Sequence, residues 1–444
     1  MIIKNCRIWT NDNQYIINGY VKIDDDKISK VGAVSDLSRI EYNKAIDGKN
    51  YLLMPGLVNC HTHLYSSLAR GMNFPNINPK NFRQILEQIW WKLDRVLDEQ
   101  SIYYSALVGG IENIRNGVTT IIDHHASPNH ISGSLNLIKK AIVDEIGIRA
   151  NLCYEITERN RGIDELNECL QENLSFLDSL SKNDDMATGL IGLHAPFTIS
   201  DNGLRKISKP LKDYKYRIHT HLSESNDDQN DAQNKGYKNV VHRLQKFDLL
   251  KENSIIAHGI HLSDEEYKIL ESSNIFLISN IESNMNNGVG VLNIPELLKT
   301  HLIIGAGNDG FGFNLLNEMR MTSLVFKDKQ LNSQEMPFSS VHKIFFENNY
   351  KIIERLFNIK IGKIKHGYKA DLILVDYKSP TEINSGNFMA HLVFGMMDKF
   401  DVKSVIINGK CVMKEEKFLS LNLDSVYKES RKVFEDLQNR LIFV

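Results

Sequence analysis

Cysteine is scarce in this sequence, and its distribution argues against two kinds of site. The 444 residues contain five cysteines, at positions 6, 60, 153, 169 and 411. Their number is odd, and no two of them form a Cys-x-x-Cys pair. The pattern argues against a disulfide framework and against a thiolate zinc site, and it favours a protein of a reducing compartment.

A basic excess and long apolar runs are also missing. Lys and Arg number 53 against 55 Asp and Glu, and no basic stripe interleaved with aromatic residues stands out. Nucleic acid and anionic membrane surfaces are therefore poor candidate partners. No stretch reaches the ~20 uncharged apolar residues that a membrane span needs, and the N-terminal segment lacks the apolar region of a secretory signal. We expect a cytoplasmic protein that binds a small, roughly neutral molecule.

The sequence does have a large apolar fraction, and its two ends have similar sequence patterns. Apolar residues make up 42% of the chain, which allows two or three domains, or one large barrel with an accessory unit. Residues 1–54 have near-alternating apolar positions and turn sequences such as Asn-Gly and Asp-Gly. Residues 366–444 show a similar pattern, with Asn-Gly at 408–409. We predict a small composite β-sandwich domain built from both chain ends, followed by a C-terminal helix.

Residues 55–365 have a different pattern, in which short apolar runs alternate with longer amphipathic stretches. One such stretch predicts a helix that begins at about Ser101 and stops at Gly117. Eight strands with helices between them predict an α/β fold, a (β/α)8 TIM barrel, whose chemistry lies at the carboxyl ends of the strands. The eight runs end near His61, Asp123, Tyr154, His194, His221, His258, Ser279 and Asp309.

Two His-x-His pairs lie at the ends of predicted strands. Because side chains alternate across a strand, His61 and His63 share one face, and His219 and His221 behave in the same way. A His-x-His pair alone is weak evidence for a metal. A hydrolytic metal site needs three or more nitrogen or oxygen ligands and an open position for water. The residues that would supply such a set are His61, His63, His221 and Asp309.

The motifs around these residues occur in the order of a known family. They are MPGLVNCHTHLYSSLARG, LHAPFTIS, HTHLSES, IAHGIHLS, NIESN and GAGNDG. Together they resemble the amidohydrolase superfamily, in its cytosine deaminase, chlorohydrolase and aminohydrolase branch. WWKLDR, YYSALVGGIENIRNGVTTIIDHHASP and NDGFG are similar to the SsnA-type aminohydrolases. The resemblance spans almost the whole chain.

The resemblance implies a metal site and catalytic roles. One divalent ion would be bound, and a His3Asp set suits zinc, with iron or manganese as alternatives. His258 would steady the attacking water, Asp309 would accept its proton, and Glu224 would act as proton shuttle. His194 would face the substrate. The implied metal ligands are His61, His63, His221 and Asp309.

Further substrate contacts are less well defined. We expect Arg70, His125 and Asn280 at the mouth of the barrel, and the roles of His124 and His219 stay open. The Trp90-Trp91 pair is interpreted as core and loop packing, because apolar residues recur around it at helical spacing. Nucleoside-handling relatives carry a Glu before the Asp-Arg of the first long loop, whereas this chain has Leu93, which makes a nucleoside a less expected substrate.

The expected activity is hydrolytic deamination of an amino-substituted nitrogen heterocycle, such as a purine- or pterin-like base, by metal-bound hydroxide. Alternatives are hydrolysis of a C–Cl bond or a cyclic amide on a similar ring, and a non-catalytic metal-binding scaffold. Binuclear amidases of the superfamily use a modified Lys in the fourth strand, which GLIGLHAP lacks. The presence of Glu224, His258 and Asp309 weighs against the scaffold. By the resemblance, a homodimer is expected.

Overall fold

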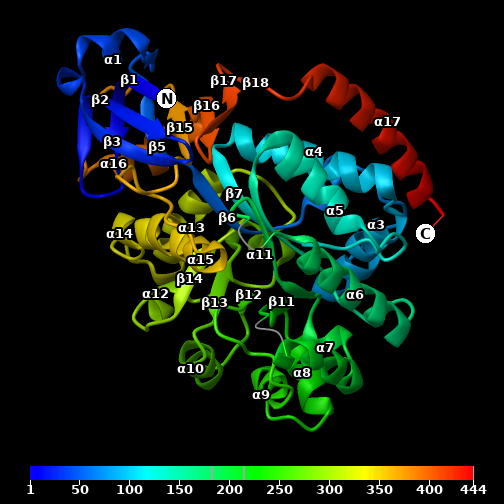
Figure 1. The fold of residues 1–444 in the computed structure, drawn as a ribbon. Helices are drawn as coiled ribbons and strands as arrows, with labels where there is room; N and C mark the ends of the chain where they lie inside the picture. Colours follow the sequence, from blue (N-terminus) through cyan, green and yellow to red (C-terminus); the bar gives the residue numbers. More distant parts are fainter. Residues whose placement is uncertain (182–183, 214–215, 444) are drawn as a thin grey trace.

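The computed structural model describes residues 1–181, 184–213 and 216–443. It is an α/β structure with two parallel sheets and one mixed sheet, and helices surround the parallel strands (Figure 1). The coarse fold class predicted from the sequence is therefore confirmed.

The parallel strands coincide with the eight predicted apolar runs. They form a four-stranded sheet, β6-β7-β8-β9, and a five-stranded sheet, β10-β11-β12-β13-β14. The fourth run is split at Leu190 into two three-residue strands, β9 and β10. Two isolated parallel bridges join residues at the sheet edges, Ile156 with Leu193 and Thr62 with Asp309. The strands are β6 (Leu57–Thr62), β7 (Val118–His125), β8 (Arg149–Tyr154), β9 (Ala187–Gly189), β10 (Ile191–Leu193), β11 (Ile218–Leu222), β12 (Ile255–His258), β13 (Phe276–Ser279) and β14 (Ile303–Ala306).

Helices lie between these strands in the sequence, as a βα repeat requires. The predicted helix near Ser101 is α4, which begins two residues earlier because Asp98 is its N-cap and exchanges hydrogen bonds with Ser101. It ends at Asn116 and Gly117, where Gly117 has a φ of +75°. The longer helices are α4 (Glu99–Arg115), α6 (Ile163–Ser179), α7 (Asp201–Asp213), α10 (Asp264–Ser272), α13 (Leu315–Gln330) and α15 (Asn349–Phe357).

The mixed sheet draws strands from both ends of the chain. Its order is β18-β17-β16-β15-β5-β1-β2-β3, with β4 (Ile46–Asp47) paired to β1, and β5 runs antiparallel to β15. In Figure 1 the blue N-terminal strands lie beside the orange C-terminal ones. The strands are β1 (Ile2–Trp9), β2 (Tyr15–Asp24), β3 (Lys27–Ala33), β5 (Leu52–Pro55), β15 (Leu372–Val375), β16 (Val402–Ile407), β17 (Lys410–Lys414) and β18 (Lys417–Phe418).

The two Asn-Gly sequences behave differently in this sheet. Asn408 and Gly409 both have positive φ and join β16 to β17, so this predicted turn is confirmed. The turn expected at Asn18-Gly19 is wrong, because both residues lie within β2. Gly19 pairs with Cys6 beside a register shift, and a Cβ there would lie 2.5 Å from Ile8 Cδ1. Glycine at this position permits close packing rather than a turn.

The C-terminal helix α17 (Leu423–Leu441) packs along α4, and the Arg115 guanidinium donates to the Tyr427 hydroxyl at 2.8 Å. Figure 1 shows this helix in red above α4. In the part of the chain that the structure describes, no helix has both the length and the apolar character to cross a membrane.

A buried ion pair connects the parallel strands to the mixed sheet. Arg149 of β8 pairs with Asp371, which precedes β15, and Asp371 also accepts the backbone N–H of Asn408 at 2.6 Å. Removing one partner leaves a buried charge uncompensated. We predict that Asp371→Ala lowers the free energy of unfolding by about 3–5 kcal/mol, measured by urea denaturation. Glu296→Ala, which breaks an exposed pair with Lys299, is the control and should change it little.

Candidate metal centre and active site

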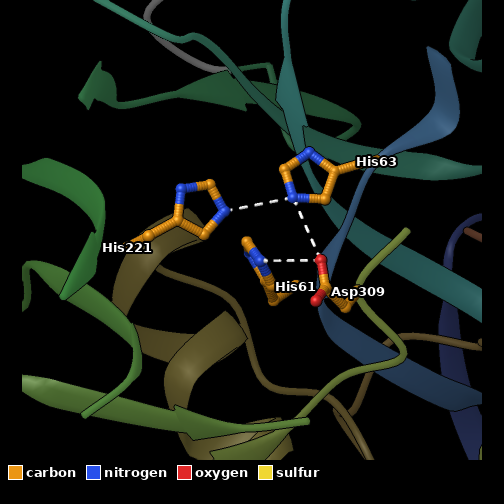
Figure 2. A group of neighbouring side chains, drawn as sticks. All are labelled: His61, His63, His221 and Asp309. Carbon is orange, nitrogen blue, oxygen red and sulfur yellow. Dashed lines mark hydrogen bonds and ion pairs between the residues drawn. The ribbon is translucent and has the colours of Figure 1, made fainter. Parts of the chain in front are cut away.

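Four side chains converge where parallel strands end, as Figure 2 shows. His61 and His63 come from the end of β6, His221 from β11, and Asp309 from the loop after β14. The Nε2 atoms of His63 and His221 lie 3.1 Å apart. Asp309 Oδ1 lies 3.1 Å from His63 Nε2 and 3.6 Å from His61 Nε2. One ligand atom from each residue fits within a group no wider than 4.8 Å.

The outer nitrogens of the three histidines are held by hydrogen bonds. His63 Nδ1 donates to the carbonyl oxygen of His124, and His221 Nδ1 donates to that of His194, both at 2.6 Å. His61 Nδ1 lies 3.0 Å from His219 Nε2. A carbonyl can only accept, so Nδ1 of His63 and His221 carries the proton, and each Nε2 presents a lone pair to the centre.

These residues fit a divalent metal ion. His61 Nε2 is buried and has no hydrogen-bond partner among the described residues, although it faces three other candidate ligands. A buried polar atom without a partner is costly unless something absent from the coordinates satisfies it. Three imidazole nitrogens and one carboxylate oxygen form a donor set suited to zinc, iron or manganese.

His219 and His124 lie behind the metal ligands rather than in the substrate pocket. His219 Nδ1 lies 3.7 Å from the Cys153 sulfur, which in turn contacts the carbonyl of Asp123 at 3.5 Å. His124 Nε2 donates to the carbonyl of His219 at 3.1 Å, and its Nδ1 lies 3.0 Å from Glu155. Both histidines therefore brace the site through hydrogen bonds.

The candidate acid–base groups lie beside the four ligands. His258 Nε2 is 3.4 Å from Glu224 Oε2 and 3.9 Å from Asp309 Oδ2. Burial, followed by the nearby Asp309 charge, raises the pKa of Glu224 well above its ordinary value. Burial would also raise the pKa of Asp309, but the close approach of His61 and His63 outweighs burial and holds that pKa well below its usual range. The two carboxyl groups are therefore suited to opposite proton roles.

Two of these residues have strained backbone conformations. His258 has a φ of +73° and Asp309 a φ of +59°, although neither is glycine. The left-handed region costs non-glycine residues free energy, and such strain concentrates at functional sites. The strain agrees with a functional role for both positions.

The site opens into a pocket with an aromatic wall. The pocket and its open mouth together contain about 800 Å³ of empty space. His194 lines it, as predicted, and the Trp91 indole N–H donates to His194 Nε2 at 3.4 Å. Apolar lining is given by Tyr65, Phe82, Leu86, Trp90, Trp91, Ala195, Phe197 and Phe311, and polar lining by His63, Ser66, Asp94, Glu155, His221, Glu224, Ser225, Asp228, Ser283, Asn287 and Asp309.

Three expected substrate contacts lie elsewhere. Arg70 is exposed at the surface, because its backbone has left the strand and turned outward. His125 is buried with its Nε2 2.9 Å from Ser127 Oγ. The buried Asn280 amide is oriented to donate to the carbonyl of Gly307 at 3.1 Å. Among the described residues these three are absent from the lining of this pocket, and their role as substrate contacts stays a prediction.

Other pocket residues were missed or undervalued from sequence. Trp90 and Trp91 line the pocket, whereas their spacing favoured core and loop packing. Arg159, which is not part of the described lining, stacks on Trp91 with a cation–ring distance of 4.8 Å and pairs with Asp94 at 2.8 Å. Leu93 is fully buried, and the next residue, Asp94, supplies the pocket carboxylate of this loop. The sequence signal that could have identified these pocket residues was the aromatic pair Trp90-Trp91, followed closely by Asp94-Arg95.

Comparisons with known proteins agree with this geometry. Residues 52–412 match the model of the amidohydrolase family. A 5'-deoxyadenosine deaminase from Methanocaldococcus jannaschii is 32% identical over 427 residues, covering 94% of this chain and 96% of that protein.

Solved structures show the same fold at lower identity. An adenosine deaminase from Xanthomonas campestris with bound zinc has a TM-score of 0.84 at 18% identity, covering 100% of this chain and 98% of that one. Atrazine chlorohydrolase TrzN from Arthrobacter aurescens, complexed with zinc, has a TM-score of 0.82 at 20% identity, with 98% and 99% covered.

Proposed function

Because the chain belongs to the amidohydrolase family, we propose that it is a metal-dependent aminohydrolase that releases ammonia from an amino-substituted nitrogen heterocycle. This reaction places it among hydrolases of non-peptide C–N bonds. The observation that carries the proposal is the meeting of a His3Asp donor set with Glu224 and His258 in one pocket. The narrower SsnA-type assignment stays a prediction.

The proposed architecture is one closed (β/α)8 barrel over residues 55–365, with a composite β domain of residues 1–54 and 366–444. The two isolated bridges support closure, because they join the edges of the two parallel sheets. Pairing of β5 with β15 supports the composite domain, because it unites the chain ends. The likeness to solved amidohydrolase structures supports the same fold.

A bound divalent ion would supply hydroxide near neutral pH, because it lowers the pKa of a coordinated water to about 7. Zinc is proposed first, and iron or manganese suits the same ligands. The residues that would hold the ion are His61, His63, His221 and Asp309.

The protein side chains account for the protons of the reaction. Asp309 accepts the first proton of the attacking water, and Glu224 donates its own proton to the ring nitrogen as the new C–O bond forms. Glu224 then accepts the proton of the hydroxyl group that is bonded to the tetrahedral carbon. At the same time, the proton held by Asp309 passes to the amino group. Ammonia leaves, and both carboxyl groups return to their starting states.

The pocket lining supports an adenine-type substrate without an anionic substituent. The named deaminase relative acts on 5'-deoxyadenosine, which has no charge on its sugar. Aromatic side chains such as Trp91 and Phe82 can stack on a flat ring. Asp94 Oδ1 is buried, has no hydrogen-bond partner in the part of the chain that the structure describes, and could accept a hydrogen bond from a sugar hydroxyl. These features restore a nucleoside as a candidate, despite Leu93.

We predict that the enzyme discriminates against phosphate. Five carboxyl groups line the described pocket (Asp94, Glu155, Glu224, Asp228 and Asp309), the pKa values of Glu155 and Asp309 are held well below the usual range, and the lining includes no Lys or Arg. A 5'-phosphate would therefore be repelled, so kcat/KM for AMP should be about 10- to 100-fold below that for 5'-deoxyadenosine. Adenosine, whose 5'-hydroxyl is uncharged, is the control. Equal use of AMP and adenosine would contradict this electrostatic description of the pocket.

The function is tested by ammonia release from the zinc-loaded protein. The substrate panel contains adenine, guanine, pterin, adenosine and 5'-deoxyadenosine. Release from any member supports the proposal and identifies the ring. If fully metallated protein released no ammonia from any member of the panel, the alternatives would be favoured. These are hydrolysis of a C–Cl bond, hydrolysis of a cyclic amide, and a non-catalytic metal-binding scaffold. The atrazine chlorohydrolase with the same fold is a precedent for the first of them.

The remaining proposals concern the cellular compartment, the partners and the oligomeric state of the protein. Five free cysteines suit a reducing cytoplasm. The balanced charge supports a small-molecule substrate rather than nucleic acid. A homodimer is proposed, and exposed apolar side chains such as Met321, Leu324 and Phe394 support it. Light scattering would give the oligomeric state.

A further inference from the structure

One short helix contacts all three candidate acid–base groups. Helix α11 (Ile281–Asn287) follows β13, and its first backbone N–H groups donate to Glu318 of α13 at 3.1 Å. Three of its side chains each donate a hydrogen bond to one of these acid–base groups. Ser283 Oγ donates to Asp309 Oδ2 at 2.6 Å, Asn284 Nδ2 to His258 Nδ1 at 2.8 Å, and Asn287 Nδ2 to Glu224 Oε1 at 3.2 Å.

The contact from Asn284 bears on the position of the proton on His258. An amide nitrogen can only donate, so Nδ1 of His258 must accept, and in the neutral ring the proton then lies on Nε2. The opposite side of the ring leads to the same conclusion. His258 Nε2 faces the ionised Asp309 carboxylate, with Oδ2 at 3.9 Å, and a lone pair on Nε2 would be repelled by this oxygen.

The Nε2 atom has no competing partner. It is buried and makes no hydrogen bond in the described structure, and His258 as a whole is fully buried. The N–H is therefore directed toward the carboxyl groups of Glu224 and Asp309.

We propose that α11 is the positioning element of the active site and that Asn284 fixes His258 as its Nε2–H tautomer. His258 then offers a hydrogen-bond donor to the oxygen that adds to the substrate and is excluded as a metal ligand through Nε2. Asn284 acts through His258 and is a positioning residue. The catalytic consequence rests on the proposed function, whereas the tautomer itself does not.

The tautomer is measured directly by NMR. Zinc-loaded protein carrying 15N-labelled histidine would be recorded, and the His258 signals identified by their loss in His258→Asn. The expected result is a protonated Nε2 and an unprotonated Nδ1. A protonated Nδ1, or an Nε2 shifted by zinc coordination, would overturn the proposal without any reference to turnover.

The catalytic consequence is measured with Asn284→Leu, which removes the donor and keeps a similar side-chain size. Loss of an outer hydrogen-bond partner typically costs 10- to 100-fold, so kcat should fall by about that factor while KM and zinc content stay nearly constant. Asn286→Leu is the matched control, because Asn286 is exposed on the same helix. Unchanged kcat in Asn284→Leu would contradict the proposal.

A double-mutant cycle separates positioning from general disruption. If Asn284 acts through His258, Asn284→Leu should cost less than about twofold in a His258→Asn background. A full additional loss there would show that Asn284 acts by another route and would overturn the proposal. Absence of wild-type turnover on the whole substrate panel would instead count against the proposed function, and the NMR result would still decide the tautomer.

Discussion

Glu224→Gln is expected to reduce kcat by about 10³-fold or more while zinc stays bound. Glutamine occupies nearly the same volume but can neither release nor accept the proton that the ring nitrogen and the leaving amine require. Glu224 is buried in the pocket and Asn287 donates to its Oε1 at 3.2 Å, so the amide can remain in place. Burial raises the pKa of Glu224, which favours the protonated carboxyl that the first proton transfer requires.

The measurement is ammonia release together with zinc content on the same samples. Asp227→Asn is the matched control, because Asp227 lies three residues further on, outside the described pocket lining, and undergoes the same acid-to-amide change. The control should retain activity. Substantial turnover by Glu224→Gln would remove Glu224 from its proton-transfer role, and loss of zinc from this variant would show that Glu224 acts on metal binding instead.

The strands that carry the site could be predicted because parallel strands are buried on both faces. Such strands appear as short continuous apolar runs, and the residues that end them stand out as polar. His61 at the end of β6 and Asp309 after β14 could therefore be recognised. The division of the fourth apolar run into two strands at Leu190 could not be predicted, because the same apolar pattern permits one strand or two.

The metal ligands were more predictable than the substrate contacts for a physical reason. Alternation along a strand fixes side-chain direction, so His61 and His63 could be placed on one face. Loop residues have no such constraint. Arg70 follows a turn that directs it to solvent, and Asn280 has its amide bonded to the backbone. His125 extends β7, and alternation separates it from His124.

The positioning role of α11 could not be read from the sequence, although NIESN, one of the family-like motifs, covers its first turn. Its run Ser-Asn-Met-Asn-Asn resembles an ordinary polar loop. Ser283 and Asn284 act on Asp309 and His258, each 26 residues away in the chain. Such long-range hydrogen bonds depend on where β13 and β12 end in space, which local pattern does not encode. Only the folded arrangement gives these amides a role.

Removal of the metal ion should abolish turnover and lower stability together. Without the ion no group remains to generate hydroxide at neutral pH, so ammonia release should fall below about 1% after chelation and return on adding zinc. The folded protein alone offers the assembled ligand set. At free zinc 1,000 times its dissociation constant, binding therefore adds about 4 kcal/mol to the free energy of unfolding, which raises the melting temperature by several degrees.

His61→Ala tests whether this linkage arises at the proposed centre. The substitution removes a ligand whose Nε2 has no other partner, so both the zinc-dependent rise in melting temperature and the turnover should disappear. His301→Ala removes an exposed histidine and should preserve both. A protein that loses turnover but keeps the full zinc-dependent stabilisation would hold its ion elsewhere. Joint loss of both properties from this one substitution is the result that links the ion, the four ligands and the reaction.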